Sequence, residues 1–364
     1  MEDGHFKKIL LALDGTDAAK EILPVVSQFA KRLNATVLLH NVVDPLKYTP
    51  LMDGLAAMVA ADNHSLYSQR LLPSLLRLGE VAPLAILKEK AEKYLARIVL
   101  ELARLGVQAE ILVSDGDPAN EIVRQARLTQ CDLIAMSTHG RNFFTRAILG
   151  SVTSKVIRSA TAPVLAITPE LASDFLDKIW DGSESGHQST LSRQQGEKEK
   201  SGKHIDKEIG TITTGAVLLD GSELAEDVLP YVLRLAQALT LEVVLLRAVA
   251  NELLYLEPSA AMAEFGANFQ AIDDALIEEA KGYLNEKAVE LGKAGLKVRT
   301  QVLRGPPVPA IIDYIRANQI NMVAMTTRGR TGLSHLILGS VADGLIRSSG
   351  LPVLLVPSDK IEGI

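Results

Sequence analysis

The segment Ser137–Ser151 reads STHGRNFFTRAILGS, and a second version, TTRGRTGLSHLILGS, occupies Thr326–Ser340 at an offset of 189 residues. Each copy holds a glycine, nine further residues and a Gly-Ser pair that opens an apolar stretch. Glycine lets the backbone approach an anion closely, and the free amides at a helix start donate hydrogen bonds to it. The repeat therefore predicts two phosphate-binding loops, each leading into a helix, in one polypeptide.

The repeat extends well beyond the loop. Over Cys131–Leu165, sixteen of 35 positions are identical at the same offset. Gly116 and Gly305 keep this offset, whereas Asp14 and Asp220 stand 206 residues apart. The first copy therefore has 17 extra residues between Asp14 and Gly116. We expect them after the second strand, where the first copy is longer.

Length and composition agree with two domains. The chain has 364 residues, more than one compact core usually holds. Hydrophobic residues make up 47% and aromatic ones 4%, which is typical of a sheet buried on both faces by helices. The stretch 183–207 is polar, charged and nearly free of large apolar residues. We expect one domain at 1–170 (module 1), a flexible linker at 171–210 and a second domain at 211–358 (module 2).

Charge and cysteine usage exclude several partners. The net charge of −6 gives no broad basic field for nucleic acid or for an anionic membrane surface. The apolar runs are too short to span a membrane. The single Cys131 excludes an internal disulfide framework and fits a reducing compartment. We expect a cytoplasmic protein that binds neither nucleic acid nor membrane.

Short apolar runs alternate with stretches of helical spacing along both copies. The predicted strands are 6–13, 35–43, 107–113, 132–136 and 163–167 in the first copy, and 215–219, 242–249, 297–303, 321–325 and 352–356 in the second. The longest helices are predicted at 85–105 and 277–291. Strands separated by helices imply an α/β fold in which each module is a mostly parallel five-stranded sheet sandwiched by helices.

Ligands of an open parallel sheet bind beyond the carboxyl ends of its strands. Asp14, Val42, Gly116 and Met136 all fall at predicted strand ends, so we expect them at one edge. The first strand is followed by neither a Walker A loop nor a GxGxxG fingerprint. The carboxylate of Asp14 is suited instead to ribose hydroxyls or to the edge of an adenine.

With these motifs the chain resembles a tandem member of the universal stress protein family. Nucleotide-binding members of that family carry G-x2-G-x9-G-[ST], an Asp after the first strand and a G-x-P-A-x-x-I element. The last three positions of the loop motif are matched in both copies, by Gly140, Gly150 and Ser151 and by Gly329, Gly339 and Ser340. The first motif glycine is replaced by Ser137 and Thr326. A required glycine there would mean weaker ATP binding, whereas a tolerated hydroxyl residue could add a donor.

The resemblance implies a Rossmann-like fold of the adenine nucleotide alpha hydrolase type, in which the two modules pair through their last strands. The implied ligand is ATP, ADP or AMP, with or without Mg²⁺, and a homodimer of the whole chain is a further expectation. Asp14 and Asp220 would contact the adenosine, Val42 and Val249 the adenine through the backbone, and Met136 and Met325 the base. The complete implied nucleotide-binding set is Asp14, Val42, Met136, Ser137, His139, Gly140, Arg141, Gly150, Ser151 and Val152 in module 1, and Asp220, Val249, Met325, Thr326, Arg328, Gly329, Arg330, Gly339, Ser340 and Val341 in module 2.

Each of these residues also has a purely structural interpretation. Gly140 and Gly150 could form only a turn and a helix start, and Ser151 could be only an N-cap. The two aspartates could be only helix caps or Asx turns. The two methionines could be plain core residues. His139 aligns with Arg328, and we align His40 with Arg247, so we expect no catalytic histidine. We also expect no metal site and no nucleophile–base pair.

Three functions remain open on the sequence. The first is a nucleotide-binding stress regulator or protective factor that is not a dedicated enzyme. The second is a slow Mg²⁺-dependent ATPase. The third is a structural or interaction protein that no longer binds nucleotide.

Overall fold

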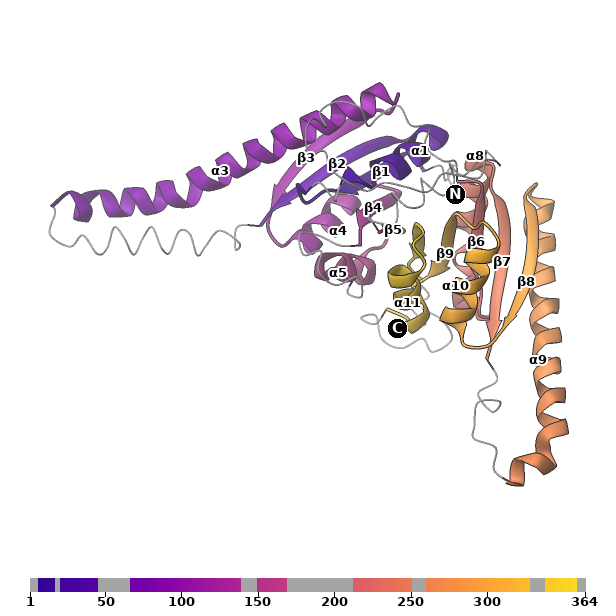
Figure 1. Cartoon of the computed structure of the whole chain (residues 1–364). Coiled ribbons are helices and arrows are strands. Elements are labelled where there is room, and N and C mark those ends of the chain that lie inside the picture. The colour runs from indigo at the N-terminus through magenta and orange to yellow at the C-terminus, as the bar shows by residue number, and fades with distance from the viewer. Residues whose placement is uncertain are drawn as a thin grey trace, which may run out of the picture.

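The computed structural model describes residues 6–16, 20–44, 66–138, 149–168, 212–250, 260–327 and 338–358, with only the backbone path at 66–83 and 260–270. Its strands form one ten-stranded sheet in the order β3-β2-β1-β4-β5-β10-β9-β6-β7-β8 (Figure 1). Neighbouring strands are parallel within each half, and β5 and β10 are antiparallel. Each half is therefore a five-stranded parallel sheet, as predicted.

The predicted strands are confirmed to within about two residues. In module 1 they are β1 (Lys8–Ala12), β2 (Thr36–Val43), β3 (Ala109–Asp115), β4 (Leu133–Ser137) and β5 (Val164–Ile167). In module 2 they are β6 (Thr214–Leu218), β7 (Glu242–Val249), β8 (Lys297–Arg304), β9 (Met322–Thr326) and β10 (Val353–Val356).

The helices of module 1 are α1 (Leu23–Leu33), α3 (Leu66–Arg104), α4 (Pro118–Leu128) and α5 (Ser151–Ser159). Those of module 2 are α7 (Glu223–Glu226), α8 (Leu229–Leu239), α9 (Ala260–Lys293), α10 (Pro307–Ala317) and α11 (Ser340–Ser348). Right-handed crossovers place α1 and α3 on one face of the first sheet and α4 and α5 on the other. In Figure 1, α3 and α9 lie on the two outer flanks of the molecule, along the edge strands that they contact.

Strand register locates the extra residues of the first copy. Ala12 pairs with His40 in module 1, and Leu218 pairs with Leu246 in module 2, so β2 and β7 still differ by 206 residues. The ends of α3 and α9, Arg104 and Lys293, already differ by 189. The insertion therefore lies after the second strand, as predicted. Both long helices begin earlier than the predicted starts at 85 and 277.

The two modules are joined by an antiparallel strand pair and by helix packing. Leu165 of β5 lies opposite Leu354 of β10. The equivalent helices α1 and α8 contact each other, and the guanidinium of Arg32 donates to the carbonyl of Leu239 at 3.2 Å. The pairing through the last strands, implied by the family resemblance, is present in the structure.

The core explains the composition. All four residues of β5 and of β10 are buried, since helices cover both faces of the sheet. The large side chains of β1 and the apolar faces of the surrounding helices join them in one continuous cluster. This core fixes the carboxyl ends of the strands, where the candidate site lies.

Candidate functional site

The sheet topology creates one switch point in each module, beyond the carboxyl ends of β1 and β4 or of β6 and β9, and we refer to this place as the crevice of the module. From β1 the chain crosses over to β2, and from β4 it crosses to β5 on the other side of β1. The connections that leave β1 and β4 therefore diverge, which is the switch point where ligands of such sheets bind. The same divergence occurs between β6 and β9 in module 2. Asp14, Ser137, Asp220 and Thr326 stand at these strand ends.

The two aspartates form the same local turn. Oδ1 of Asp14 accepts from the amide of Thr16 at 3.0 Å and from its hydroxyl at 2.5 Å. Oδ1 of Asp220 accepts from the amide of Ser222 at 2.9 Å and from its hydroxyl at 2.6 Å. The Asx-turn interpretation is therefore correct at both positions. Such a turn holds each carboxylate at the rim of its crevice, which is compatible with a ligand contact.

The helices that follow the repeated loop begin at a glycine. Gly150 and Gly339 are the N-cap residues of α5 and α11, with φ of −56° and −58° and no side-chain cap. Ser151 is the first residue of α5, so its interpretation as an N-cap is wrong. The amide of Gly150 donates to the carbonyl of Thr138 at 2.9 Å, and that of Gly339 to Thr327 at 3.1 Å. The first-turn amides that follow have no partner within an α-helix and carry the positive end of the helix dipole. Each crevice thus contains a helix start suited to an anion.

Six predicted site residues lie outside the described residues. They are His139, Gly140 and Arg141 of the first loop and Arg328, Gly329 and Arg330 of the second. The assignment of these residues to a phosphate site stays a prediction.

The structure explains how Ser137 and Thr326 replace the first motif glycine. Both residues lie in strands, as the last residues of β4 and β9. Neither is among the described residues with a positive φ, so their backbone conformation does not require glycine. The hydroxyl of Thr153 in α5 also donates to the carbonyl of Ser137 at 2.9 Å. The backbone conformation therefore gives no reason to require glycine at the first motif position.

The remaining predicted residues are mostly packed into the protein. Met136 is buried, and the partly buried Met325 packs against the core, as do Val42, Val152 and Val341. The interpretation of the two methionines as core residues therefore agrees with their burial.

Backbone hydrogen bonds correct the sequence alignment at the second strand. The carbonyl of Val43 accepts from Gly116, and that of Val249 accepts from Gly305 in the same way. Val249 is therefore equivalent to Val43 and not to Val42. By the same register His40 is equivalent to Leu246, so the pairing of His40 with Arg247 was wrong by one residue.

Two residues at this edge were missed from the sequence, Asn41 and its equivalent Arg247. Asn41 Nδ2 donates to the carbonyl of Leu13, at the end of β1, at 2.7 Å. Arg247 is only 5% exposed. Its guanidinium pairs with Glu279 at 2.9 Å and lies 5.3 Å from the ring centre of Tyr283, both on α9. The uninterrupted offset of 206 residues through β2 was the signal that would have identified this pair.

His40 faces the other side of the sheet. Its Nε2 lies 2.9 Å from the Ser114 hydroxyl on β3. The pKa of His40 is lowered to about 4, mainly by burial, which Glu121 opposes and Arg124 assists. The imidazole is therefore neutral near pH 7. Module 2 has leucines at both positions, so the His40–Ser114 pair is a structural difference between the modules and not a repeated site.

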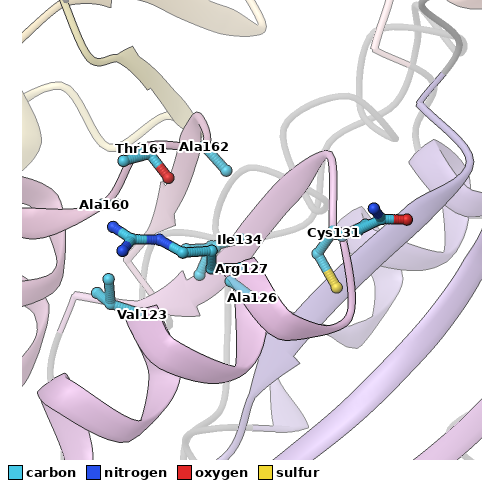
Figure 2. Close-up of a pocket in the computed structure, with 9 residues that line it drawn as sticks. Val123, Ala126, Arg127, Cys131, Ile134, Ala160, Thr161 and Ala162 are labelled. Atoms are coloured by element: carbon cyan, nitrogen blue, oxygen red, sulfur yellow. The ribbon is translucent and has the colours of Figure 1, made fainter.

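A pocket of about 220 Å³, shown in Figure 2, is lined mainly by residues that precede β4 and β5. It is therefore at the amino ends of these strands, whereas the candidate site is at the carboxyl ends. Small side chains create it, including Ala126, Cys131 and Ala162. Module 2 has the larger, buried residues Ile315, Ile320 and Leu351 at these positions. Burial raises the pKa of the Cys131 thiol, which keeps it protonated and unreactive. The remaining lining residues are Val123, Arg127, Gln130, Ile134, Ala160 and Thr161.

No helix in the described part of the chain is long and apolar enough to cross a membrane. Among the same residues, no group of three or more His, Cys, Asp or Glu side chains is arranged to hold a metal ion.

Comparisons with known proteins place these features in a family. The universal stress protein family model matches residues 5–168 and 216–357. Universal stress protein Slr1230 of Synechocystis is 23% identical over 96% of this chain and 99% of its own length. Universal stress protein MJ0531 of Methanocaldococcus jannaschii is 30% identical over 44% of this chain and 82% of its own length.

A solved structure shares the overall fold. The crystal structure of a universal stress protein from Archaeoglobus fulgidus covers 98% of this chain and 100% of its own, with a TM-score of 0.57 and 17% identity. The resemblance seen in the loop motifs thus extends over both halves of the sequence and over the ten-stranded fold. The chain belongs to the universal stress protein family.

Proposed function

We propose that the chain binds an adenine nucleotide, ATP, ADP or AMP, in the crevice of one or both modules. It acts as a regulator or protective factor in the stress response rather than as a dedicated enzyme. The observation that carries the proposal is the helix start at Gly150 and Gly339, next to the switch point of each half-sheet. A helix start without a side-chain cap offers its amides to phosphate oxygens.

The described residues fit the two ends of a nucleotide. At the helix start, the Ser151 hydroxyl and the amides of the first turn supply donors for phosphate. At the end of β1, the exposed carboxylate of Asp14 supplies an acceptor for ribose hydroxyls or for the adenine amino group. Ser340 and Asp220 occupy the equivalent places in module 2.

A hydrogen-bonded chain links the first loop to the second module, which supports a regulatory role. Thr138, the last described residue before the loop, donates its hydroxyl to Thr168 at 3.1 Å. The Thr168 hydroxyl donates in turn to the carbonyl of Ile346 in α11 at 3.5 Å. A ligand bound at the helix start of Gly150, whose amide donates to the carbonyl of Thr138, would act on this connection between the modules.

The decisive test places a carboxylate at each helix start. Gly150→Asp combined with Gly339→Asp leaves an allowed N-cap conformation, because both glycines have negative φ, and Asp is a favourable N-cap residue. The new carboxylates would occupy the first-turn amides and repel phosphate. We expect the wild-type chain to bind ATP saturably in equilibrium dialysis and the double variant to lose this binding while staying folded.

The matched control is Gly150→Ala with Gly339→Ala, which adds a methyl group without charge or a hydrogen-bond acceptor. It should retain most of the binding. Equal loss in the alanine and aspartate variants, or an absence of wild-type binding at millimolar ATP, would contradict the proposal and favour a structural or interaction role.

Phosphate release distinguishes the second candidate, a slow Mg²⁺-dependent ATPase. Release above the rate without protein, abolished both by EDTA and by the two aspartates, would establish hydrolysis at these crevices. Mg²⁺ usually binds substrate phosphates together with one or two carboxylates, so we expect it to arrive with the triphosphate.

A further inference from the structure

The two crevices differ at positions where their residues are equivalent. Helices α5 and α11 both begin with Ser and Val, but the next three residues are Thr153, Ser154 and Lys155 in the first and Ala342, Asp343 and Gly344 in the second. These positions form the turn that a phosphate group would approach. The affinities of the two sites for nucleotide therefore depend on the side chains at these three positions.

Charge at the helix start differs between the modules. α5 has no acidic residue in its first turn and carries Lys155 and Arg158. α11 has Asp343 in its first turn, bound by Arg347 through two hydrogen bonds of 2.8 Å. A carboxylate in the first turn already interacts with the positive end of the helix dipole and repels an anionic ligand there.

Lys155 adds a cation that module 2 lacks. Its ammonium group lies 3.0 Å from Asp117, the N-cap residue of α4. Helix α5 together with Asp117 carries one net positive charge, from Lys155 and the last-turn Arg158 against Asp117. The equivalent positions in module 2, Pro306, Gly344 and Arg347, together with Asp343, carry none.

The loop start is also fastened differently. In module 1 the Thr153 hydroxyl donates to the carbonyl of Ser137, which ties the first turn of α5 to the end of β4. Ala342 has no hydroxyl with which to form the equivalent bond. The first turn is therefore more firmly positioned in module 1.

The nucleoside end shows the same asymmetry. Arg247 lies directly beneath the turn after β6, where a Cβ added to Gly221 would be 2.9 Å from its Cζ. The equivalent Asn41 is farther from its turn, with Nδ2 4.0 Å from a Cβ built on Gly15. Arg247, Glu279 and Tyr283 together form the Arg247 cluster. The pKa of Tyr283 is raised mainly by burial, then by Glu226 and by the half-buried Asp220, so Asp220 interacts with groups of its own module. Asp14 is exposed.

We propose that the two modules are functionally unequal: module 1 is the tighter adenine nucleotide site, and the acidic start of α11 and the Arg247 cluster weaken the site in module 2. This inference rests on the proposed nucleotide binding and adds which site fills first. One nucleotide per chain is bound at low ATP concentration, and the Kd values of the two sites differ by at least about tenfold, the equivalent of about 1.4 kcal/mol.

Single-site variants test the order of filling. Calorimetric titration of the wild-type chain with ATP should give a tight phase of one nucleotide per chain. We expect Gly150→Asp to remove this phase, and Gly339→Asp to remove only the weaker binding. Two equal sites, or a tighter site lost in Gly339→Asp, would overturn the inference while leaving the proposed function intact. No binding by the wild-type chain at millimolar ATP would overturn both.

A charge exchange tests the cause. Ser154→Asp places a carboxylate four residues before Arg158, as Asp343 stands before Arg347, and should weaken the tight site about fivefold. The neutral variant Ser154→Asn is the matched control and should stay within about twofold of the wild type. Asp343→Ser should strengthen the weak site by a similar factor. Equal effects of Ser154→Asp and Ser154→Asn would show that charge at the helix start does not set the order.

Discussion

At the scale of single residues, positions 40 and 246 occupy the same place in the two modules with different chemistry. His40 is 1% exposed and hydrogen-bonded to Ser114, whereas module 2 has Leu246 with Leu303 as the equivalent of Ser114. The pKa of His40 is lowered mainly by burial, so the folded state favours the neutral ring. This residue couples the stability of module 1 to pH.

This coupling predicts that the protein loses stability as the pH falls. The pKa of His40 is 6.5 as a reference and about 4 in the fold, so the unfolded chain binds more protons between these values. The free energy of unfolding should be unaffected by His40 above pH 6.5 and should decrease as the pH falls towards 4, by about 3 kcal/mol in total. Urea unfolding between pH 4 and 7 measures this contribution.

The matched variant is His40→Leu with Ser114→Leu, the pair found in module 2. It should reduce the loss of stability between pH 6.5 and pH 4 by about that amount. An unchanged pH dependence in this variant would show that other groups are responsible.

Residue-level prediction from the sequence succeeded where the chemistry is local. The Asx turns were foreseen as an alternative because Asp-Gly-Thr and Asp-Gly-Ser contain their own partners. Asn41 and Arg247 were missed because their roles depend on strand register, and a one-residue error in the alignment paired Arg247 with His40. A side chain's neighbours across a sheet are not encoded in its own segment.

At the scale of secondary-structure elements, the equivalent helix pairs α4–α5 and α10–α11 have different side chains at the same contact. Module 1 combines the small Ala119 with Lys155, and module 2 combines Val308 with Gly344. A Cβ on Gly344 would lie 2.8 Å from Cγ2 of Val308, which is shorter than a normal contact. The glycine is therefore required by the approach of α10 and not by the α-helical conformation of its own backbone.

Gly344→Ala should therefore destabilise the protein by about 1 kcal/mol, although alanine is the better helix former. In a Val308→Ala background, the same change should become stabilising by a similar amount, because the contact is removed and the propensity gain remains. Thermal unfolding of the four proteins measures this double-mutant cycle. Additive effects of the two changes would contradict the packing explanation.

Element-level prediction was best for the strands, whose short apolar runs bounded by turn residues are clear in the sequence. It was poorest for α3 and α9, which begin at Leu66 and Ala260. The early part of α3 contains Pro73 and Pro83, which interrupt the helical pattern of the sequence, so periodicity predicts the helix only from residue 85. A helix can continue through a segment in which the periodicity of apolar residues is weak.

At the scale of the whole molecule, the chain contains both halves of a pseudo-symmetric pair. Leu165 and Leu354 are equivalent residues of the two copies, and they face each other in the β5–β10 pair. A pseudo-twofold axis therefore passes close to them. The physical patterns of the sequence did not predict this pairing, because buried strands such as VLAI and VLLV have no preferred neighbour; only the family resemblance implied it.

The interface should hold the modules together without a covalent link. If a protease site is placed within 183–207 and cut, we expect the two fragments to elute together in size-exclusion chromatography. The β5–β10 pair and the α1–α8 contact bury apolar surface between them. Separate elution of folded fragments would contradict this expectation.

A control variant with Leu165→Glu and Leu354→Glu should release the fragments, since it buries two like charges at the pseudo-twofold axis. The homodimer expected from the resemblance stays a prediction. Because β5 and β10 already pair within the chain, such a dimer would use another surface.

The central claim is that the crevices hold an adenine nucleotide, and the nucleotide content of the purified protein tests it most directly. The chain is denatured after purification and the released nucleotides are separated and quantified per chain. We predict adenine nucleotide from the wild-type protein and almost none from the variant with Gly150→Asp and Gly339→Asp. The claim is contradicted if the wild-type protein releases none even after incubation with millimolar ATP and rapid removal of the excess.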